Sequence, residues 1–579
     1  MYRFINVSFL KGNLNILFSV FSFFLFFNHA NGNEAFEKND SLLLLLQNEL
    51  NREMEELSKA ETPPYYMAYR VNDLESVSLK ASLGSVVNTD HMSRRIAGVS
   101  VRVGDYNFDN TRVEDNSGGY SPYQNNVTGI LPGEDKPEAI NHSLWLLTDQ
   151  AYKEAVTTYN QLVQKEKYNK NQKKNGPDFS VEEPGVHFEP RQKSLAEFDF
   201  EPWKKILSEV TGEFLKYPDI VQADAFMNYF TERKYLVSTE GSSVVQNFSY
   251  AQLHLLCAIR EKDGTLVPYY KTFTGLTPDQ VLDNVELLPE AKNIAGKLRK
   301  LLDAPMAEPY TGPAILSPHA TGVFFHEIFG HRIESHRFKG ESDGQTFAKK
   351  LGEKVLPKFM NVQFNPLVEE YNTTPLIGNY KYDDEGVKAE KVDIIRNGIL
   401  VDFLRSRIPY GKKATSNGHG RAMAGVNPVA RQSNMFVTSE KPKTEKELRK
   451  LLIKECKKQD LPYGYYFKEV IGGFTFTQRS MPNVFNIIPL EVYRVYTDKR
   501  PDELVKGVDL IGTPLVMFSK IKATSENYEV FNGFCGAESG NVPVSTIAPA
   551  MFVTQIETQL KNVQKMKVPV LNRPWEGMP

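Results

Sequence analysis

Residues 324 to 336, FFHEIFGHRIESH, combine histidines and a glutamate at a spacing close to that of a zinc-binding pattern. In the HExxH pattern, two histidines on one helix face bind zinc and the glutamate acts as a general base. Here one additional residue separates His326-Glu327 from His331. Residues five apart point about 140° apart on a regular helix, so a wide turn is needed to bring both imidazoles to one face. Gly330 would make this distortion easy. The spacing therefore allows His326 and His331 to bind zinc with Glu327 as the general base, and the alternative is that the histidines are hydrogen-bonded core residues of an apolar helix.

A third zinc ligand must come from another part of the chain, because catalytic zinc takes three protein ligands and one water. Cys535 is the favoured candidate. It lies in NGFCGAESGNVPVS, which we expect to form a glycine-rich loop between strands, where a thiolate can point into a cavity. Cys257 in an alternating strand and Cys456 in a basic helix occupy ordinary positions for buried cysteines. One zinc ion per chain is expected.

Other polar residues near the histidines are expected to have different roles. His319 lies about 10 Å from His326 along the helix axis, which is too far for binding the same ion. Glu334 is a candidate for orienting an imidazole. A fourth ligand such as His336 or His419 would close the site and indicate a structural zinc ion instead of a catalytic one.

The histidines are expected on a helix that is capped by Ser317, opens with Pro318 and continues to His336. Apolar periodicity predicts further helices at 42–59, 143–168, 200–216, 277–303 and 444–458. Strands are predicted at 65–72, 76–87, 96–107, 219–231, 243–261 and 265–274. In VDIIRNGILVDFL, Asn397-Gly398 predicts a tight hairpin, and short strands are expected to dominate the second half of the chain.

A chain of 579 residues is too long for one ordinary core. The proline-rich stretch APMAEPYTGP, residues 304 to 313, is the expected domain joint. We expect an α+β protein with an α/β N-terminal domain at 33–304 and a β-rich C-terminal domain at 305–579 that carries the histidines. The 69 basic and 71 acidic residues give a net charge of -2, so no overall field favours nucleic acid.

The first 32 residues resemble a secretory signal peptide. Arg3 and Lys11 precede an apolar run at 16–27, and Ala30-Asn31-Gly32 offers a cleavage site. We expect residues 1–32 to be removed, which leaves an exported, periplasmic or extracellular protein without a membrane span. The alternative is an uncleaved N-terminal membrane anchor. The three cysteines leave at least one thiol without a partner in the chain.

Four motifs together resemble the TldD/PmbA family of metallopeptidases, also called modulators of DNA gyrase. They occur in the expected order over about 316 to 546, and they are HEIFGHRIE, YDDEGVKAEKVDIIRNGILVDFLRSR, ATSNGHGRAMAGVNPVARQSN and FCGAESGNVPVS. The region around 110–200 and residues 476–505 depart from the family pattern, which leaves the choice of substrate open.

The resemblance implies a zinc peptidase with His326, His331 and Cys535 as ligands and Glu327 as the catalytic carboxylate. It also implies a homodimer, or a heterodimer with a related chain. Arg421 and Arg431 could contact a substrate carboxylate or the developing oxyanion, or form structural ion pairs instead. We expect unfolded or short peptides as substrates. The alternative is a non-catalytic exported binding or scaffold protein whose zinc is structural.

Overall fold

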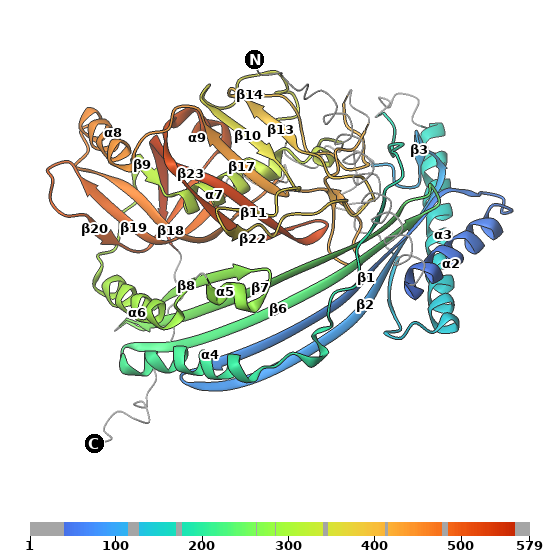
Figure 1. Ribbon diagram of the computed structural model, residues 1–579. Helices are drawn as coiled ribbons and strands as arrows, with labels where there is room; N and C mark the ends of the chain where they lie inside the picture. Colours follow the sequence, from blue (N-terminus) through green and yellow to red (C-terminus); the bar gives the residue numbers. More distant parts are fainter. Residues whose placement is uncertain are drawn as a thin grey trace, which may run out of the picture.

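The computed structural model describes residues 40–113, 127–168, 176–261, 263–283, 285–339, 345–411, 415–477 and 485–561. The expected signal peptide at 1–32 lies outside these residues. The described chain forms two layers, each built on its own sheet and joined by the segment after residue 303 (Figure 1). The fold is therefore α+β with two parts, as the sequence indicates.

The N-terminal layer is a strongly curved, mostly antiparallel sheet in the order β3-β2-β1-β6-β7-β5, with β4 paired to β2 and β8 paired to β7. Its strands are β1 (Pro64–Ser82), β2 (Ser85–Asp105), β3 (Phe108–Asp109), β4 (Val127–Leu131), β5 (Val186–Phe188), β6 (Ile220–Ser238), β7 (Ser243–Arg260) and β8 (Leu266–Gly275). Its helices are α2 (Ser41–Leu57), α3 (Pro137–Tyr168), α4 (Glu201–Glu213), α5 (Pro278–Asp283) and α6 (Leu287–Asp303). Helices α4 and α6 pack on one end of the long strands, and α2 and α3 pack on the other.

Two details of the N-terminal layer differ from the sequence expectation. The predicted strands 65–72 and 76–87 are largely one strand, β1, which ends in a turn at Leu83-Gly84. The polar residues Asn72 and Asp73 do not interrupt it, because the Asn72 amide donates to Glu232 and Asp73 accepts from Arg95 on neighbouring strands. The single helix predicted over 277–303 is two helices, α5 and α6, separated by an extended Glu286.

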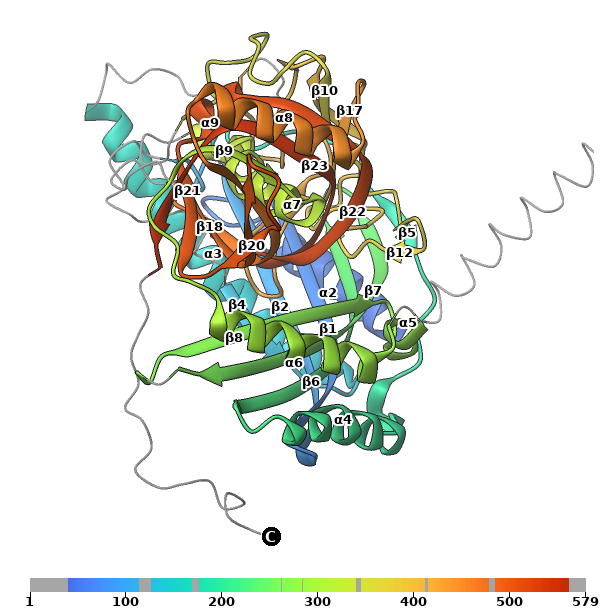
Figure 2. The same cartoon turned by 90° about the vertical axis from the view of Figure 1, so that its left-hand side faces the viewer.

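The C-terminal layer closes on itself. Strand β9 pairs with both β18 and β23, and β19 and β21 complete a ring of hydrogen-bonded strands. Figure 2 shows α7 (Pro318–Ile328) lying inside this ring. The ring strands are β9 (Thr311–Leu316), β18 (Tyr463–Thr475), β19 (Phe485–Tyr496), β21 (Val508–Gly512) and β23 (Gly540–Leu560). Strand β22 (Ile521–Ala537) forms a long hairpin with β23.

Shorter elements surround the ring. The strands are β10 (Met360–Phe364), β11 (Glu370–Tyr371), β12 (Thr374–Pro375), β13 (Val392–Arg396), β14 (Ile399–Leu400), β15 (Gly420–Arg421), β16 (Val429–Ala430), β17 (Asn434–Ser439) and β20 (Glu503–Val505), and the helices are α8 (Glu445–Lys458) and α9 (Pro514–Lys520). Asn397 and Gly398 have positive φ angles of 52° and 77°, which confirms the predicted hairpin turn. The expectation that short strands dominate is wrong for β18, β19, β22 and β23, because their long-range pairing partners are not visible in the local sequence.

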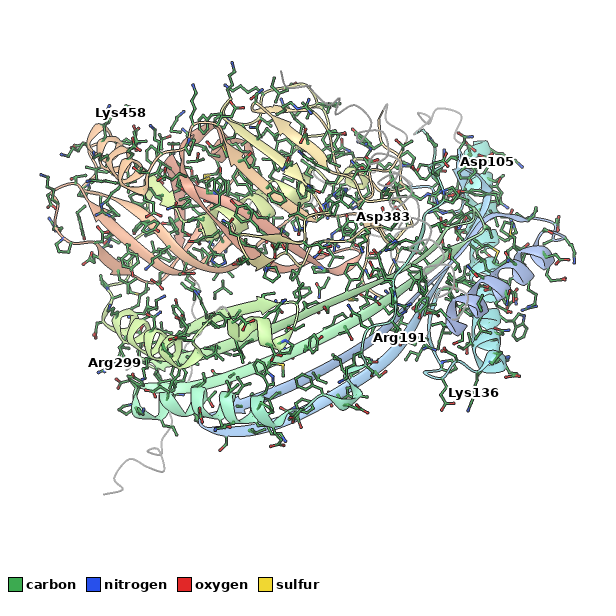
Figure 3. All side chains as sticks on the ribbon, viewed as in Figure 1. Asp105, Lys136, Arg191, Arg299, Asp383 and Lys458 are labelled. Atoms are coloured by element: carbon green, nitrogen blue, oxygen red, sulfur yellow. The ribbon has the colours of Figure 1, made fainter. Side chains whose placement is uncertain are left out.

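The two layers meet through charged loops. In Figure 3, Asp383 lies where the C-terminal loops approach the curved sheet. Next to it, Asp384 accepts a 2.8 Å hydrogen bond from Lys234 on β6. Over the part of the chain that is described, no helix combines the length and apolar character required to cross a membrane.

Candidate metal centre

Helix α7 holds the first histidine in the interior of the ring. Ser317 caps the helix by accepting a hydrogen bond from the backbone N–H of Ala320, and Pro318 occupies its first turn, as predicted. Every residue from Ala320 to Ile328 is buried. A helix buried on all sides needs an apolar sequence, and ATGVFFHEI provides one around His326 and Glu327.

The spacing predicted a helix that continues to His336 through a wide turn, and this prediction is wrong. The helix ends at Ile328, and residues Gly330–Arg332 form a tighter 3-10 turn that carries His331. The Arg332 guanidinium explains the end of the helix. It donates hydrogen bonds of 2.8 and 3.3 Å to the carbonyl oxygens of Glu327 and Ile328, which would otherwise lack partners. The two histidines therefore converge across a helix end and not across a π-bulge.

Gly330 has a different role from the one predicted. Its backbone does not have a positive φ angle, so a glycine is not needed here for its backbone conformation. A Cβ atom there would lie 1.9 Å from Oε1 of Gln432, whose amide also donates to the His326 carbonyl at 3.3 Å. Glycine therefore leaves the space through which the buried Gln432 side chain reaches the end of α7.

We expect Gly330→Ala to destabilise the protein by about 1 to 3 kcal/mol, because the added methyl group overpacks a buried site. Gly296→Ala is the matched control, because Gly296 lies on the exposed face of helix α6 and its added Cβ meets nothing within 4 Å. This substitution should stabilise the protein by about 0.5 to 1 kcal/mol. Urea unfolding of both variants measures the difference. Equal stability of the two variants would contradict the close approach of Gln432.

Three potential ligands converge beside the helix end. The ligand atoms of His326, His331 and Cys535 all lie within 4.8 Å of one another, and all three side chains are buried. Nε2 of His331 is 3.4 Å from Sγ of Cys535, and the two imidazole planes are 82° apart. Zinc bonds of about 2.0 to 2.3 Å hold tetrahedral ligand atoms about 3.3 to 3.8 Å apart. The donor set and its spacing fit zinc.

Cys535 lies in strand β22, not in the loop that its glycine-rich surroundings predicted. It pairs with Val542 on β23, and the turn follows at residues 538–539, with Gly540 at a φ angle of 80°. The hairpin with β23 forms because this pairing supplies backbone hydrogen bonds that a local sequence does not reveal. Strand geometry then directs the Cys535 side chain inward, where it is 1% exposed.

Charges around Cys535 favour the thiolate. Burial by itself would raise the pKa of this thiol, but His331, Arg431 and His326 outweigh burial and hold the pKa well below its usual value. Burial would lower the pKa of His331, whereas Cys535 and Glu334 raise it to about 10. Binding of a metal ion between Cys535 and His331 would therefore use the existing thiolate and release the proton of the imidazole.

Glu334 orients the second imidazole, in the position predicted for it. Its Oε2 atom is 3.5 Å from Nδ1 of His331, which leaves Nε2 facing Cys535. Two hydrogen bonds from Arg337, of 2.9 and 3.0 Å, fix the carboxylate. Burial would raise the pKa of Glu334, but Arg337 and His331 lower it to about 2. A buried carboxylate that stays ionised holds the imidazole as the outer partners of metal ligands do.

Glu327 follows His326 and lies at the wall of a cleft of about 490 Å³ between the two layers. Burial raises the pKa of its carboxyl group above the usual value, although His326 and His331 oppose this. Gly473 on β18 makes room for the side chain, because a Cβ there would lie 2.8 Å from the Cγ atom of Glu327. A carboxylate with a raised pKa beside the ligand cluster is suited to accept a proton from water.

Arg421 and Arg431 are buried and engaged with the protein. Arg431 donates to Ser539 at 2.7 Å and to the carbonyl oxygen of Cys535, so it supports the strand that carries the thiol. Arg421 donates to the carbonyl oxygen of Pro543 at 2.8 Å and lies over the ring of Tyr380. These contacts favour the structural interpretation of both arginines, and substrate contact stays a prediction.

The other candidate histidines, His319, His336 and His419, do not join the cluster. Both ring nitrogens of His419 have other partners, the carbonyl oxygen of Asn417 and the hydroxyl of Ser433. His336 pairs with Glu538, and His319 lies in the cleft 3.4 Å from Glu469. Among the described residues, the metal-ligand cluster has three members.

The other cysteines lie away from the cluster. Cys257 on β7 and Cys456 on α8 are free and buried in separate apolar cores, which agrees with the strand and helix positions predicted for them.

Several residues that support the site were missed from the sequence, among them Arg332, Arg337, Gln432 and Gly473. Gln432 follows Arg431 within a motif that carries the resemblance, which was a usable signal. Gly473 lies within strand β18, and a glycine inside a strand often marks the close approach of another group. Gln432 and Gly473 act by shape, which the types of residue in a motif do not reveal.

Comparisons with known proteins show which proteins this chain is similar to. The sequence model described as PmbA/TldA metallopeptidase C-terminal domain matches residues 309–559. A metalloprotease of Methanocaldococcus jannaschii is 30% identical over 352 residues, which cover 60% of this chain and 71% of the relative. A zinc metalloprotease TldD homolog of Saccharolobus solfataricus is 27% identical over 338 residues, which cover 57% of this chain and 70% of the relative.

Solved structures share the fold. A protein described as a modulator of DNA gyrase from Thermotoga maritima superposes with a TM-score of 0.58 at 16% identity, over 89% of this chain and all of that one. TldE from Thermococcus kodakarensis gives a TM-score of 0.59 at 15% identity, over 89% of this chain and 99% of that one. At these identities the likeness concerns the arrangement of helices and strands.

Proposed function

This chain belongs to the TldD/PmbA family of metallopeptidases, and from that premise we propose that it hydrolyses peptide bonds with one zinc ion per chain. The observation that carries the proposal is the convergence of His326, His331 and Cys535 beside Glu327. Two imidazoles and a thiolate are ligands that zinc prefers, and three protein ligands leave a position for water.

Zinc, when bound by these three ligands, would lower the pKa of water toward about 7 and polarise the carbonyl of the bond to be cut. The residues of the chain supply the remaining steps. Glu327 takes a proton from the attacking water and returns it to the leaving amine. Glu334 keeps Nε2 of His331 directed at the site throughout.

The alternative is a binding or scaffold protein with structural zinc. Such a site needs four protein ligands. His419 and His336, the candidates for the fourth, are engaged with Ser433 and Glu538 instead. The contacts of these two residues support the enzyme over the scaffold.

The cleft supports unfolded peptides as the substrate class. Its walls are strands of both layers, including β8 on one side and β18 and β22 on the other. A cleft of about 490 Å³ has room for a short extended peptide segment but not for a folded domain. Strand edges also bind extended backbones through hydrogen bonds.

We expect a reduced and alkylated globular protein to be cut at least about 100-fold faster than its native form, because a stable fold leaves few unfolded chains at any moment. Mass spectrometry of timed digests, with and without a chelator, measures both rates. Cleavage within the core of the native protein at the rate of the unfolded form would contradict the proposal.

Location and assembly are further proposals. The charged start, apolar run and small residues of the first 32 residues support export with removal of this segment. Assembly as a homodimer, or as a heterodimer with a related chain, is proposed from the resemblance of the four sequence motifs to the family.

A further inference from the structure

Next to the cleft that holds Glu327, a second hollow of about 790 Å³ lies between the layers. Phe534 lines both spaces, so it marks their junction. The second hollow is bounded by β6 and β7 of the curved sheet and by loops of the C-terminal layer that carry Leu367 and Met423. A peptide long enough to reach from the cleft into the second hollow would pass Phe534.

Phe534 is next to the proposed ligand Cys535 on β22. Successive side chains of a strand point to opposite faces. Accordingly, Cys535 is 1% exposed and faces the ligand cluster, whereas Phe534 is 40% exposed and faces the cleft. Phe534 therefore lines the same cleft as His326 and Glu327.

Aromatic contacts connect Phe534 to the opposite layer. Its ring centroid lies 5.0 Å from that of Tyr250 on β7, and Tyr250 stacks on Phe230 of β6 at 5.1 Å. Together with Leu367 and Met423, these rings form what we call the apolar wall, defined by Phe230, Tyr250, Leu367, Met423 and Phe534. Leu367 and Met423 are 50% and 45% exposed.

Both spaces contain polar groups. In the cleft, Glu469 contacts His319 and Lys271. The second hollow is lined by charged side chains such as Glu232, Lys234 and Arg421, and it also exposes the large apolar side chains of the apolar wall. Exposed apolar surface in a concavity that also holds polar groups is typical of a ligand pocket.

We propose that the apolar wall receives a large apolar side chain of the substrate, close to the bond that is cut. The inference rests on the proposed peptidase function and adds a substrate preference to it. Phenylalanine, leucine and methionine side chains suit this wall, because each would gain apolar contacts with exposed side chains such as Phe534, Leu367 or Met423. Burial of such a side chain favours its peptide by about 10- to 100-fold over one with a small or acidic residue.

The test uses a defined library of unfolded decapeptides and maps the cut bonds of the zinc-loaded protein by mass spectrometry. Phenylalanine, leucine and methionine should be enriched about 10-fold or more over glycine and glutamate at one position within two residues of the cut. Met423→Glu and Leu367→Glu should reduce the enrichment to a few-fold or less. Leu351→Glu is the matched control, since Leu351 is 55% exposed and lies outside both spaces.

A second readout separates this inference from the proposed function. The same library is passed over immobilised Glu327→Gln protein, and the retained peptides are sequenced. Cleavage or retention without apolar enrichment, or enrichment that persists in both wall variants, would overturn the apolar wall and leave the peptidase intact. If nothing is cleaved, the proposed function fails, and retention alone then decides whether the wall selects apolar peptides.

Discussion

Glu327→Gln should abolish peptide hydrolysis while the protein stays folded and keeps its zinc. The carboxylate lies at the cleft wall but is not one of the three convergent ligands. Glutamine has nearly the same shape and fills the space opposite Gly473, but it cannot take a proton from water. General acid–base groups contribute about 10²- to 10⁴-fold to rate, and we expect a loss in that range.

The measurement compares kcat/KM on an unfolded peptide with zinc content for the same preparation. Glu526→Gln is the matched control, because Glu526 is on the same strand as Cys535 but exposed away from the cleft. Near-normal turnover of the Glu327→Gln variant with zinc bound would remove Glu327 from the chemistry.

His331→Ala should lose most of the bound zinc. The substitution leaves two of the three ligands and removes the group that Glu334 orients. Losing even an outer partner of a metal ligand weakens binding by about 10- to 100-fold, so losing the ligand should cost more. After equilibration with a competing chelator, zinc content should fall below about a tenth of the wild-type value.

His319→Ala is the control for this loss. His319 is on the same helix as His326 but pairs with Glu469 in the cleft, so its removal should leave zinc content unchanged. His331→Gln provides a second variant that fills more of the buried space. Zinc retained at wild-type affinity in both His331 variants would mean that the ligand set is different.

Many features of the fold could be predicted from the sequence. Amphipathic helices such as α2 and α8, the cap at Ser317 and the turn at Asn397-Gly398 depend on residues close in the chain, and they were predicted close to their observed bounds. The two-part α+β organisation follows from the change in pattern after residue 304. Local signals were sufficient for these features.

The geometry of the site was less accessible because distant contacts determine it. The end of helix α7 depends on Arg332, and the spacing of the histidines alone suggested a wide turn instead. Cys535 is in a strand because it pairs with Val542, while its glycine-rich neighbours suggested a loop. The sequence could identify the residues that converge, but not the path by which the backbone brings them together.

Zinc titration of hydrolysis tests the central claim most directly. The protein is stripped with a chelator, and zinc is added back in known amounts while cleavage of an unfolded peptide and bound metal are measured together. The account predicts no hydrolysis without metal and full recovery at one zinc per chain, with no recovery in Glu327→Gln. Hydrolysis that continues in the stripped protein, or one bound zinc per chain without any hydrolysis, would contradict it.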